Sequence, residues 1–277
     1  MSVLIGRAWQ HIFWDPPYRT LLWDENLLKP IIEKVFGIKW EKYVTDIAID
    51  HAIQSTIIGI GIFLFLVAAS CIFIKKSKRV IGYLIAVSGG ILILISIAYW
   101  KEYFWDIPQF LELTAQWMSP FIFLSVVHAF DKNINVFRLL NFTLVFTFVG
   151  HGLYALGIYP LPGNWIDLVI NTFHCNESSA NIFIKVFGAL DIASAILIFI
   201  PRLRKVGFYY MLIWGFLAAF GRLTGNFIPD LGIIPFIQAN FGEFVYRIPQ
   251  FILALMGLYL LKEQKIILHA SIKKKQE

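Results

Sequence analysis

Ionisable and amide side chains occur inside segments of this sequence that are otherwise apolar, and their spacing places several of them side by side. His151 and Tyr154 are three residues apart, and Glu112 and Gln116 are four apart, so each pair shares one face of a helix. Histidine, tyrosine and carboxylate groups hold and transfer protons in active sites. These pairs therefore indicate proton transfer at a site that also binds a polar group.

A second set of such residues follows in the C-terminal half. Asp191 lies in the middle of one apolar segment, Arg222 lies in the next, and Arg247 and Gln250 are three apart in the last. The candidate catalytic residues are His151, Tyr154, Asp191 and Glu112, and the candidate substrate-binding residues are Gln116, Arg222, Arg247 and Gln250. Their spacing does not require a metal site, which needs three or four ligands in a compact arrangement.

Several of these residues also have a purely structural interpretation. Asp191 could form a buried ion pair with Arg222 or Arg247 that only fixes the register of two helices. His151 could donate to a neighbouring backbone carbonyl, and Tyr154 could anchor its helix at the membrane interface. The glutamines could join helices by hydrogen bonds without touching a ligand.

The composition shows which elements must position these residues. The chain has 277 residues, of which 58% are apolar and only 15% charged, and its mean hydropathy is +0.69. A soluble domain is closer to a quarter charged, so the composition excludes a disordered chain and a nucleic-acid-binding module. One helical span of a bilayer needs about 20 apolar residues, and about seven such runs can be found.

The sequence therefore predicts an all-α fold, a polytopic transmembrane helix bundle of about seven spans. The expected spans are residues 52–74, 80–100, 107–128, 139–159, 181–200, 206–225 and 244–261. We expect a single membrane domain over residues 1–277. Residues 51–261 would form the bundle, 262–277 a basic tail, and 1–50 a lid on the outer face. Apolar residues recur at helical spacing between Leu27 and Phe36, which predicts an interfacial amphipathic helix in that lid.

Basic residues gather in alternate connections of this seven-span arrangement. Segments 75–79, 129–138, 201–205 and 262–277 hold most of them, whereas the connections between those segments are mainly acidic. The positive-inside rule then puts the C-terminus in the cytoplasm and residues 1–50 outside. We expect a multi-pass protein of the inner (plasma) membrane. With this orientation all the candidate residues except Asp191 fall in the outer half of the membrane, which predicts a polar cavity that opens outward.

The C-terminal half resembles the DoxX-like group of small bacterial integral membrane proteins. The similar stretches are His151-Gly-Leu-Tyr-Ala-Leu-Gly157, Phe187-Gly-Ala-Leu-Asp-Ile-Ala-Ser-Ala195 and Ile198-Phe-Ile-Pro-Arg202, within residues 140–261. Gly188 and Asp191 match the glycine and the acidic residue of that group's pattern, with aspartate where glutamate is commoner. Members are four-helix bundles associated with quinone-linked oxidation or membrane redox complexes. The resemblance thus implies a quinone as ligand and other membrane redox subunits as partners.

The leading hypothesis is a quinone-linked membrane redox protein or subunit. A quinone head group would be hydrogen-bonded by His151 and Tyr154, and Asp191 or Glu112 would relay a proton. One alternative is a non-catalytic assembly subunit whose buried polar groups only specify packing. Another is a proton-coupled transporter of a small solute, with Asp191 near the midplane as its binding residue. The lipid bilayer is a partner in each case, and nucleic acid in none.

Overall fold

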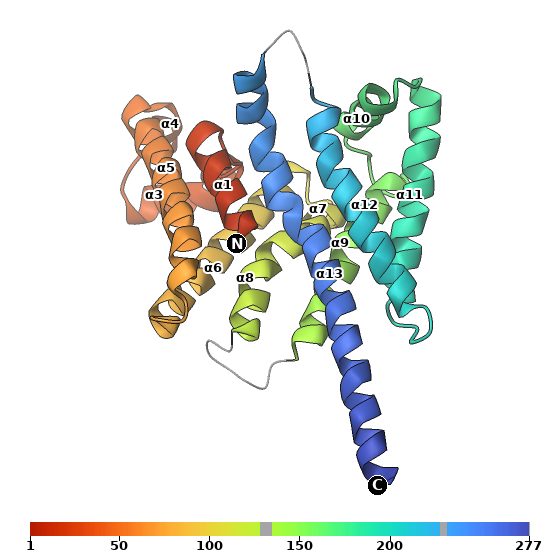
Figure 1. Ribbon diagram of the computed structural model, residues 1–277. Helices are drawn as coiled ribbons and strands as arrows, with labels where there is room; N and C mark the ends of the chain where they lie inside the picture. The colour runs from red at the N-terminus through yellow and green to blue at the C-terminus, as the bar shows by residue number, and fades with distance from the viewer. Residues whose placement is uncertain (128–134, 228–231, 277) are drawn as a thin grey trace.

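The long apolar runs of the sequence form helices, because a chain in lipid must satisfy its backbone hydrogen bonds internally. The computed structural model describes residues 1–127, 135–227 and 232–276, with side chains as far as residue 263, and all regular elements in those ranges are helical (Figure 1). Within these ranges, six helices are long and apolar enough to cross a membrane. They are α5 (Ile47–Ser70), α6 (Lys78–Glu102), α9 (Val136–Ala155), α11 (Glu177–Leu197), α12 (Arg204–Thr224) and α13 (Ile233–Gln276). The chain is therefore a multi-span helical membrane protein.

Three of these helices begin at a side chain that caps the first turn. The carboxylate of Asp46 accepts from the backbone N–H of Ala48 at the start of α5. Asn135 and Asn176 cap α9 and α11 in the same way. Such residues satisfy backbone donors that the first helical turn leaves free. The caps explain why α5 and α11 begin a few residues before the apolar runs that predicted them.

The predicted third span, residues 107–128, differs from the structure. As far as Val127 it consists of two short helices, α7 (Ile107–Glu112) and α8 (Thr114–Val126), so the expectation of one continuous span was wrong. The break lies at Leu113, where the ψ angle is −2°. The hydroxyl of Thr147 on α9 accepts from the backbone N–H of Ala115, 2.9 Å away, and so satisfies a donor that the break would leave free.

A glycine on α9 lets this broken helix come close. A Cβ atom at Gly150 would lie 2.5 Å from the backbone nitrogen of Glu112 and 2.9 Å from the carbonyl oxygen of Pro108. Both neighbours are backbone atoms of α7, which cannot move aside as a flexible side chain can. Gly150 is therefore required where α7 crosses α9, next to the backbone of Glu112.

We expect Gly150→Ala to lower the free energy of unfolding by about 1–3 kcal/mol, because the added methyl group pushes α7 away from α9. Gly90→Ala is the matched control, since a Cβ atom at Gly90 would meet open space. Thermal unfolding in lipid nanodiscs, followed by tryptophan fluorescence, compares the two variants. Equal midpoints would show that α7 and α9 are not in backbone contact.

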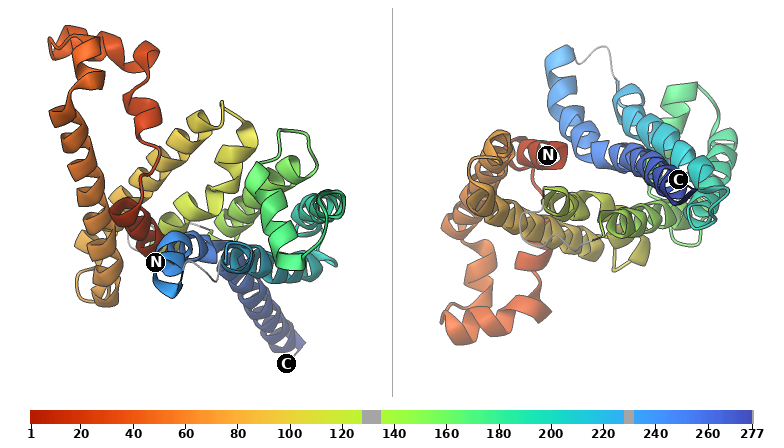
Figure 2. Two further views of the ribbon diagram at one scale, coloured as in Figure 1. Left: turned by 90° about the horizontal axis from the view of Figure 1, so that it is seen from above. Right: turned by 60° about the horizontal axis from the view of Figure 1, so that its bottom comes forward.

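The N-terminal fifty residues divide into a buried helix and a projecting arm. Helix α1 (Ser2–Phe13) packs against α5 and α13, and Leu4, Arg7 and His11 on it are buried. The short helices α2 (Arg19–Leu22), α3 (Glu25–Val35) and α4 (Trp40–Thr45) follow, and a 3₁₀ turn η1 (Cys71–Phe73) extends α5. Viewed from above, α3 and α4 stand out from the other helices (Figure 2).

Helix α3 has the amphipathic pattern that the sequence predicted for residues 27–36. Asp24 caps it, and Pro30 lies inside it. Its apolar residues Leu27, Ile31 and Val35 are exposed in the structure. A helix with an uncovered apolar face of this kind suits the membrane surface, and its placement there stays a prediction.

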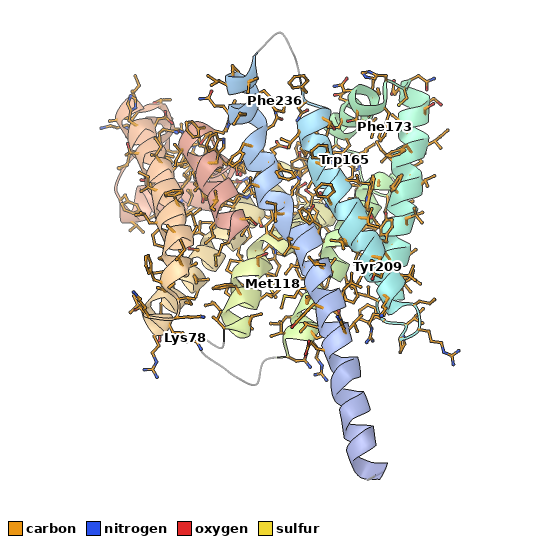
Figure 3. All side chains as sticks on the ribbon, in the orientation of Figure 1. Lys78, Met118, Trp165, Phe173, Tyr209 and Phe236 are labelled. Carbon is orange, nitrogen blue, oxygen red and sulfur yellow. The ribbon has the colours of Figure 1, made fainter. Side chains whose placement is uncertain are left out.

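The basic connections gather at one end of the bundle. Lys78, at the start of α6, lies at the lower end of the bundle, and so does the turn between α11 and α12, where α13 also ends (Figures 1 and 3). Residues 128–134, which include most of the predicted basic segment 129–138, lie outside the described residues. The arrangement agrees with the alternation of basic and acidic connections along the sequence.

Candidate functional site

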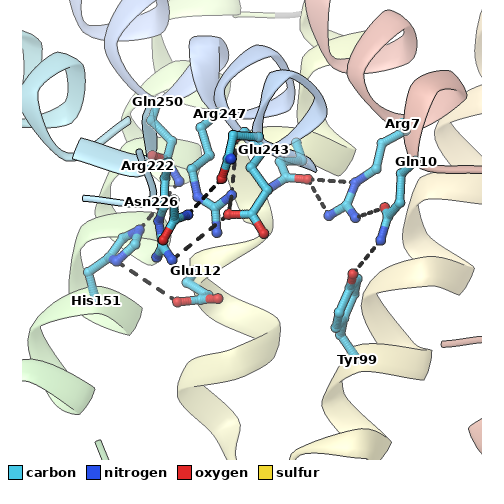
Figure 4. Close-up of polar contacts among 12 residues, drawn as sticks. Arg7, Gln10, Tyr99, Glu112, His151, Arg222, Asn226, Glu243, Arg247 and Gln250 are labelled. Atoms are coloured by element: carbon cyan, nitrogen blue, oxygen red, sulfur yellow. Dashed lines mark hydrogen bonds and ion pairs between the residues drawn. The ribbon is translucent and has the colours of Figure 1, made fainter. Parts of the chain in front are cut away.

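Three helices bring His151 to a chain of hydrogen-bonding groups (Figure 4). The amide of Gln250 on α13 lies 3.3 Å from Nε2 of His151 on α9. The carboxylate of Glu112, at the end of α7, lies 3.9 Å from Nδ1 of the same ring. Since an amide nitrogen can only donate to Nε2, the imidazole proton belongs on Nδ1, facing Glu112. Gln109 donates to Glu112 at 3.2 Å, and Tyr154 lies 3.5 Å from Gln109.

Beside this chain two arginines share one carboxylate. Glu243 on α13 has its Oε2 atom 3.5 Å from Arg247, one turn later, and 3.9 Å from Arg222 on α12. Arg247 also donates to the backbone carbonyl of Glu243. In the part of the chain that the structure describes, Arg222 has this ion pair and no hydrogen bond. Arg222 is nevertheless buried, with 7% of its surface exposed.

A third arginine lies on the other side of α13. Arg7 on α1 donates two hydrogen bonds to the side-chain oxygen of Gln116 on α8, at 2.9 and 2.5 Å. It also donates to Gln10, which in turn donates to Tyr99, and its guanidinium lies 4.1 Å from the ring centre of Tyr246. Gln116, a predicted substrate-binding residue, is therefore a partner of Arg7 that joins α1 to α8.

A cavity of about 470 Å³ opens beside the first two groups. Its walls come from α9, α11, α12, α13 and the short helix α10 (Gly163–Phe173). Its polar lining consists mainly of His151, Asp191, Arg222, Arg247 and Gln250. Most of the remaining lining is apolar or aromatic, with Trp165, Phe173, Phe183, Phe187, Trp214 and Phe220 among it. The cavity thus has a wide apolar part and one strongly polar end.

Helix α10 covers the cavity and was not predicted. It carries Trp165 and Phe173, which lie near the upper parts of α12 and α11 (Figure 3). The amide of Asn171 donates to the backbone carbonyl of Gly225 at 3.0 Å, which ties α10 to the end of α12. The ring of Trp165 lies 5.4 Å from that of His151, so α10 also closes over the polar end.

Asp191 faces the cavity from α11 without an arginine partner. Its carboxylate accepts from the hydroxyl of Tyr210 on α12 at 2.9 Å, and it is 3% exposed. The structural alternative, an ion pair with Arg222 or Arg247, is not formed among the described residues. A buried carboxyl group at a cavity wall can exchange a proton with a ligand.

The structure brings five of the eight predicted site residues to one cavity, namely His151, Asp191, Arg222, Arg247 and Gln250. Glu112 and Tyr154 are joined through Gln109 by hydrogen bonds, Glu112 lies 3.9 Å from His151, and Tyr154 is fully buried. Sequence reasoning missed Glu243 and Arg7. Glu243 lies four residues before Arg247, a spacing that pairs charges on a helix and could have identified it.

Comparisons with known proteins do not assign this chain to a family. No family model matches the chain, and no curated protein or solved structure matches it. The resemblance to the DoxX-like group therefore rests on the short motifs quoted above.

Proposed function

We propose that this membrane protein binds an amphiphilic molecule from the bilayer in the cavity between α9 and α13. The observation that carries the proposal is the division of the cavity into an apolar part and a polar end with His151, Arg222, Arg247 and Gln250. Ligand pockets are typically apolar with a few convergent polar groups that orient the ligand. The head group would lie at the polar end, and the apolar part would lie along α10, α11 and α12.

Quinone-linked redox chemistry is the specific form of this function that the sequence suggests. Gln250 and Arg222 offer hydrogen-bond donors for a quinone carbonyl oxygen, and the aromatic side chains of the cavity suit its ring. Asp191, held by Tyr210, is the group we assign to proton exchange. His151 and Glu112 would orient the ring and relay protons. The protein would lie in the inner membrane, with its basic end in the cytoplasm.

A cavity-filling variant tests the proposal. Gly221 lines the cavity, and a Cβ atom there would meet open space, so Gly221→Leu adds volume without a backbone clash. We expect decylubiquinone to raise the unfolding midpoint of the wild type in nanodiscs, because it binds only the folded state. The same probe should not stabilise Gly221→Leu. Gly90→Leu adds the same side chain elsewhere and should respond as the wild type does.

Equal responses of wild type and Gly221→Leu would contradict the binding of a quinone in this cavity. A small-solute carrier is the second candidate, because the break at Leu113 gives the bundle a discontinuous helix, as in many transporters. Solute uptake into proteoliposomes that Asp191→Asn abolishes would support that function. A protein that binds no amphiphile and transports no solute would fit the non-catalytic assembly subunit, with redox subunits of the membrane as its partners.

A further inference from the structure

Two guanidinium groups, those of Arg222 and Arg247, line the polar end of the cavity. Glu243 is the carboxylate that pairs with both of them, at 3.5 Å from Arg247 and 3.9 Å from Arg222, whereas Asp191, the carboxylate in the cavity wall, accepts from Tyr210 instead. Charge inside a bilayer is costly unless it is closely paired, so two guanidinium groups that share one distant carboxylate favour the binding of a further anion.

Of the two arginines in the cavity wall, Arg222 uses less of its hydrogen-bonding capacity. Its guanidinium borders the cavity, and its ion pair with Glu243 is 3.9 Å long. A guanidinium has five N–H donors in a planar fork that fits carboxylate or phosphate oxygens. Arg222 is 7% exposed and borders the cavity, so the free donors can be reached from the cavity. They are available to a ligand in the cavity.

Glu243 is placed so that a ligand could replace it. Its contacts with the two arginines are long, and its side chain is 38% exposed. It also lines a second cavity of about 350 Å³, between α1, α6 and α13, together with Trp9, Asn240 and Tyr246. The carboxylate therefore has space to turn away from Arg222 when another anion binds there.

We infer that the head group of the ligand is an anionic oxyacid, a carboxylate or a phosphate, which binds between Arg222 and Arg247 in place of the Glu243 carboxylate. The inference rests on the proposed binding of an amphiphile and not on its quinone form. A neutral head group would leave Arg222 and Arg247 with one distant carboxylate, whereas an oxyacid supplies both a close negative charge and paired acceptor oxygens. The apolar chain would extend between α10, α11 and α12.

A matched pair of brominated probes tests the charge of the head group. 11-Bromoundecanoate and 11-bromoundecanol have the same chain, and bromine quenches tryptophans that it contacts, here Trp165 and Trp214 in the cavity wall. In phosphatidylcholine nanodiscs we expect the carboxylate to bind about tenfold to a hundredfold more tightly than the alcohol, the range expected for hydrogen bonds to a charged group. Trp214→Phe should remove part of the quenching.

Three variants separate recognition from folding. Arg222→Met should abolish the preference for the carboxylate, whereas Lys185→Met, which removes an exposed charge from the neighbouring helix α11, should keep it. Glu243→Gln should raise the affinity for the carboxylate and leave that for the alcohol unchanged, because a competing anion is removed. A gain of affinity is not expected from a loss of structure, so this variant remains informative if Arg222→Met does not fold.

The outcomes separate the two proposals. Equal binding of both probes, or a Glu243→Gln variant without a gain, would overturn the anionic head group while binding of an amphiphile still stands. Absence of quenching by either probe would contradict amphiphile binding itself. Inorganic phosphate is the third arm. If it displaces bromoundecanoate at millimolar concentration, the anion comes from water and the inferred lipid-like ligand is wrong.

Discussion

Replacing Arg7 with alanine should lower the free energy of unfolding by about 3 kcal/mol or more. The substitution removes two hydrogen bonds to Gln116, one to Gln10 and the contact with the Tyr246 ring, and it leaves a cavity between α1, α8 and α13. The side chain is 2% exposed, so water cannot replace these contacts in place. Thermal unfolding in nanodiscs measures the loss, and limited proteolysis shows whether α1 has left the bundle.

Lys29→Ala is the control for this experiment. Lys29 forms an ion pair with Glu25 on the exposed surface of α3, and such pairs contribute little to stability. We expect its midpoint to stay close to that of the wild type. If Arg7→Ala unfolds at the same temperature as Lys29→Ala, then α1 is not held in the bundle by Arg7.

Replacing Glu112 with alanine is expected to have the second large effect. It should lower the free energy of unfolding by about 3–5 kcal/mol, because it leaves buried positive charge without a partner. Glu112 faces His151 and lies within the electrostatic reach of Arg247 and Arg222. Removal of one cation should therefore restore part of the stability, so the double variant Glu112→Ala/Arg247→Met should be more stable than Glu112→Ala alone. The measurement is a double-mutant cycle of unfolding free energies.

Lys185→Met provides the comparison for that cycle. It also removes one positive charge, from an exposed position on α11, and should not rescue Glu112→Ala. Strictly additive effects of Glu112→Ala and Arg247→Met would mean that the Glu112 carboxylate does not compensate Arg247.

The membrane spans could be predicted because a bilayer requires long apolar helices, and α5, α6, α9, α11 and α12 lie where the apolar runs indicated. The break at Leu113 could not be predicted in this way. It depends on the hydroxyl of Thr147 and on the missing side chain of Gly150, both on a helix distant in sequence. A hydropathy pattern reports the environment of a segment and not its contacts with other segments.

The candidate site, too, could be predicted only in part, because the sequence pattern does not show contacts between distant segments. Residues inside apolar runs, such as His151 and Arg222, could be identified because polar groups in lipid need a reason to be there. Arg7 lies in a short N-terminal segment that no span pattern marks, although its helix packs against α5 and α13. Helix α10 is short enough to depend on tertiary packing, so its role as a cover over the cavity became visible only in the structure.

The most direct test of amphiphile binding is to identify the molecule that the cavity holds in the native membrane. The protein would be extracted with its surrounding lipid by an amphipathic polymer, and the amphiphiles would be quantified by mass spectrometry in wild type and Gly221→Leu. We predict one species enriched to about one molecule per protein in the wild type and lost from Gly221→Leu. Identical lipid profiles in the two samples, with no stoichiometric species, would contradict the account.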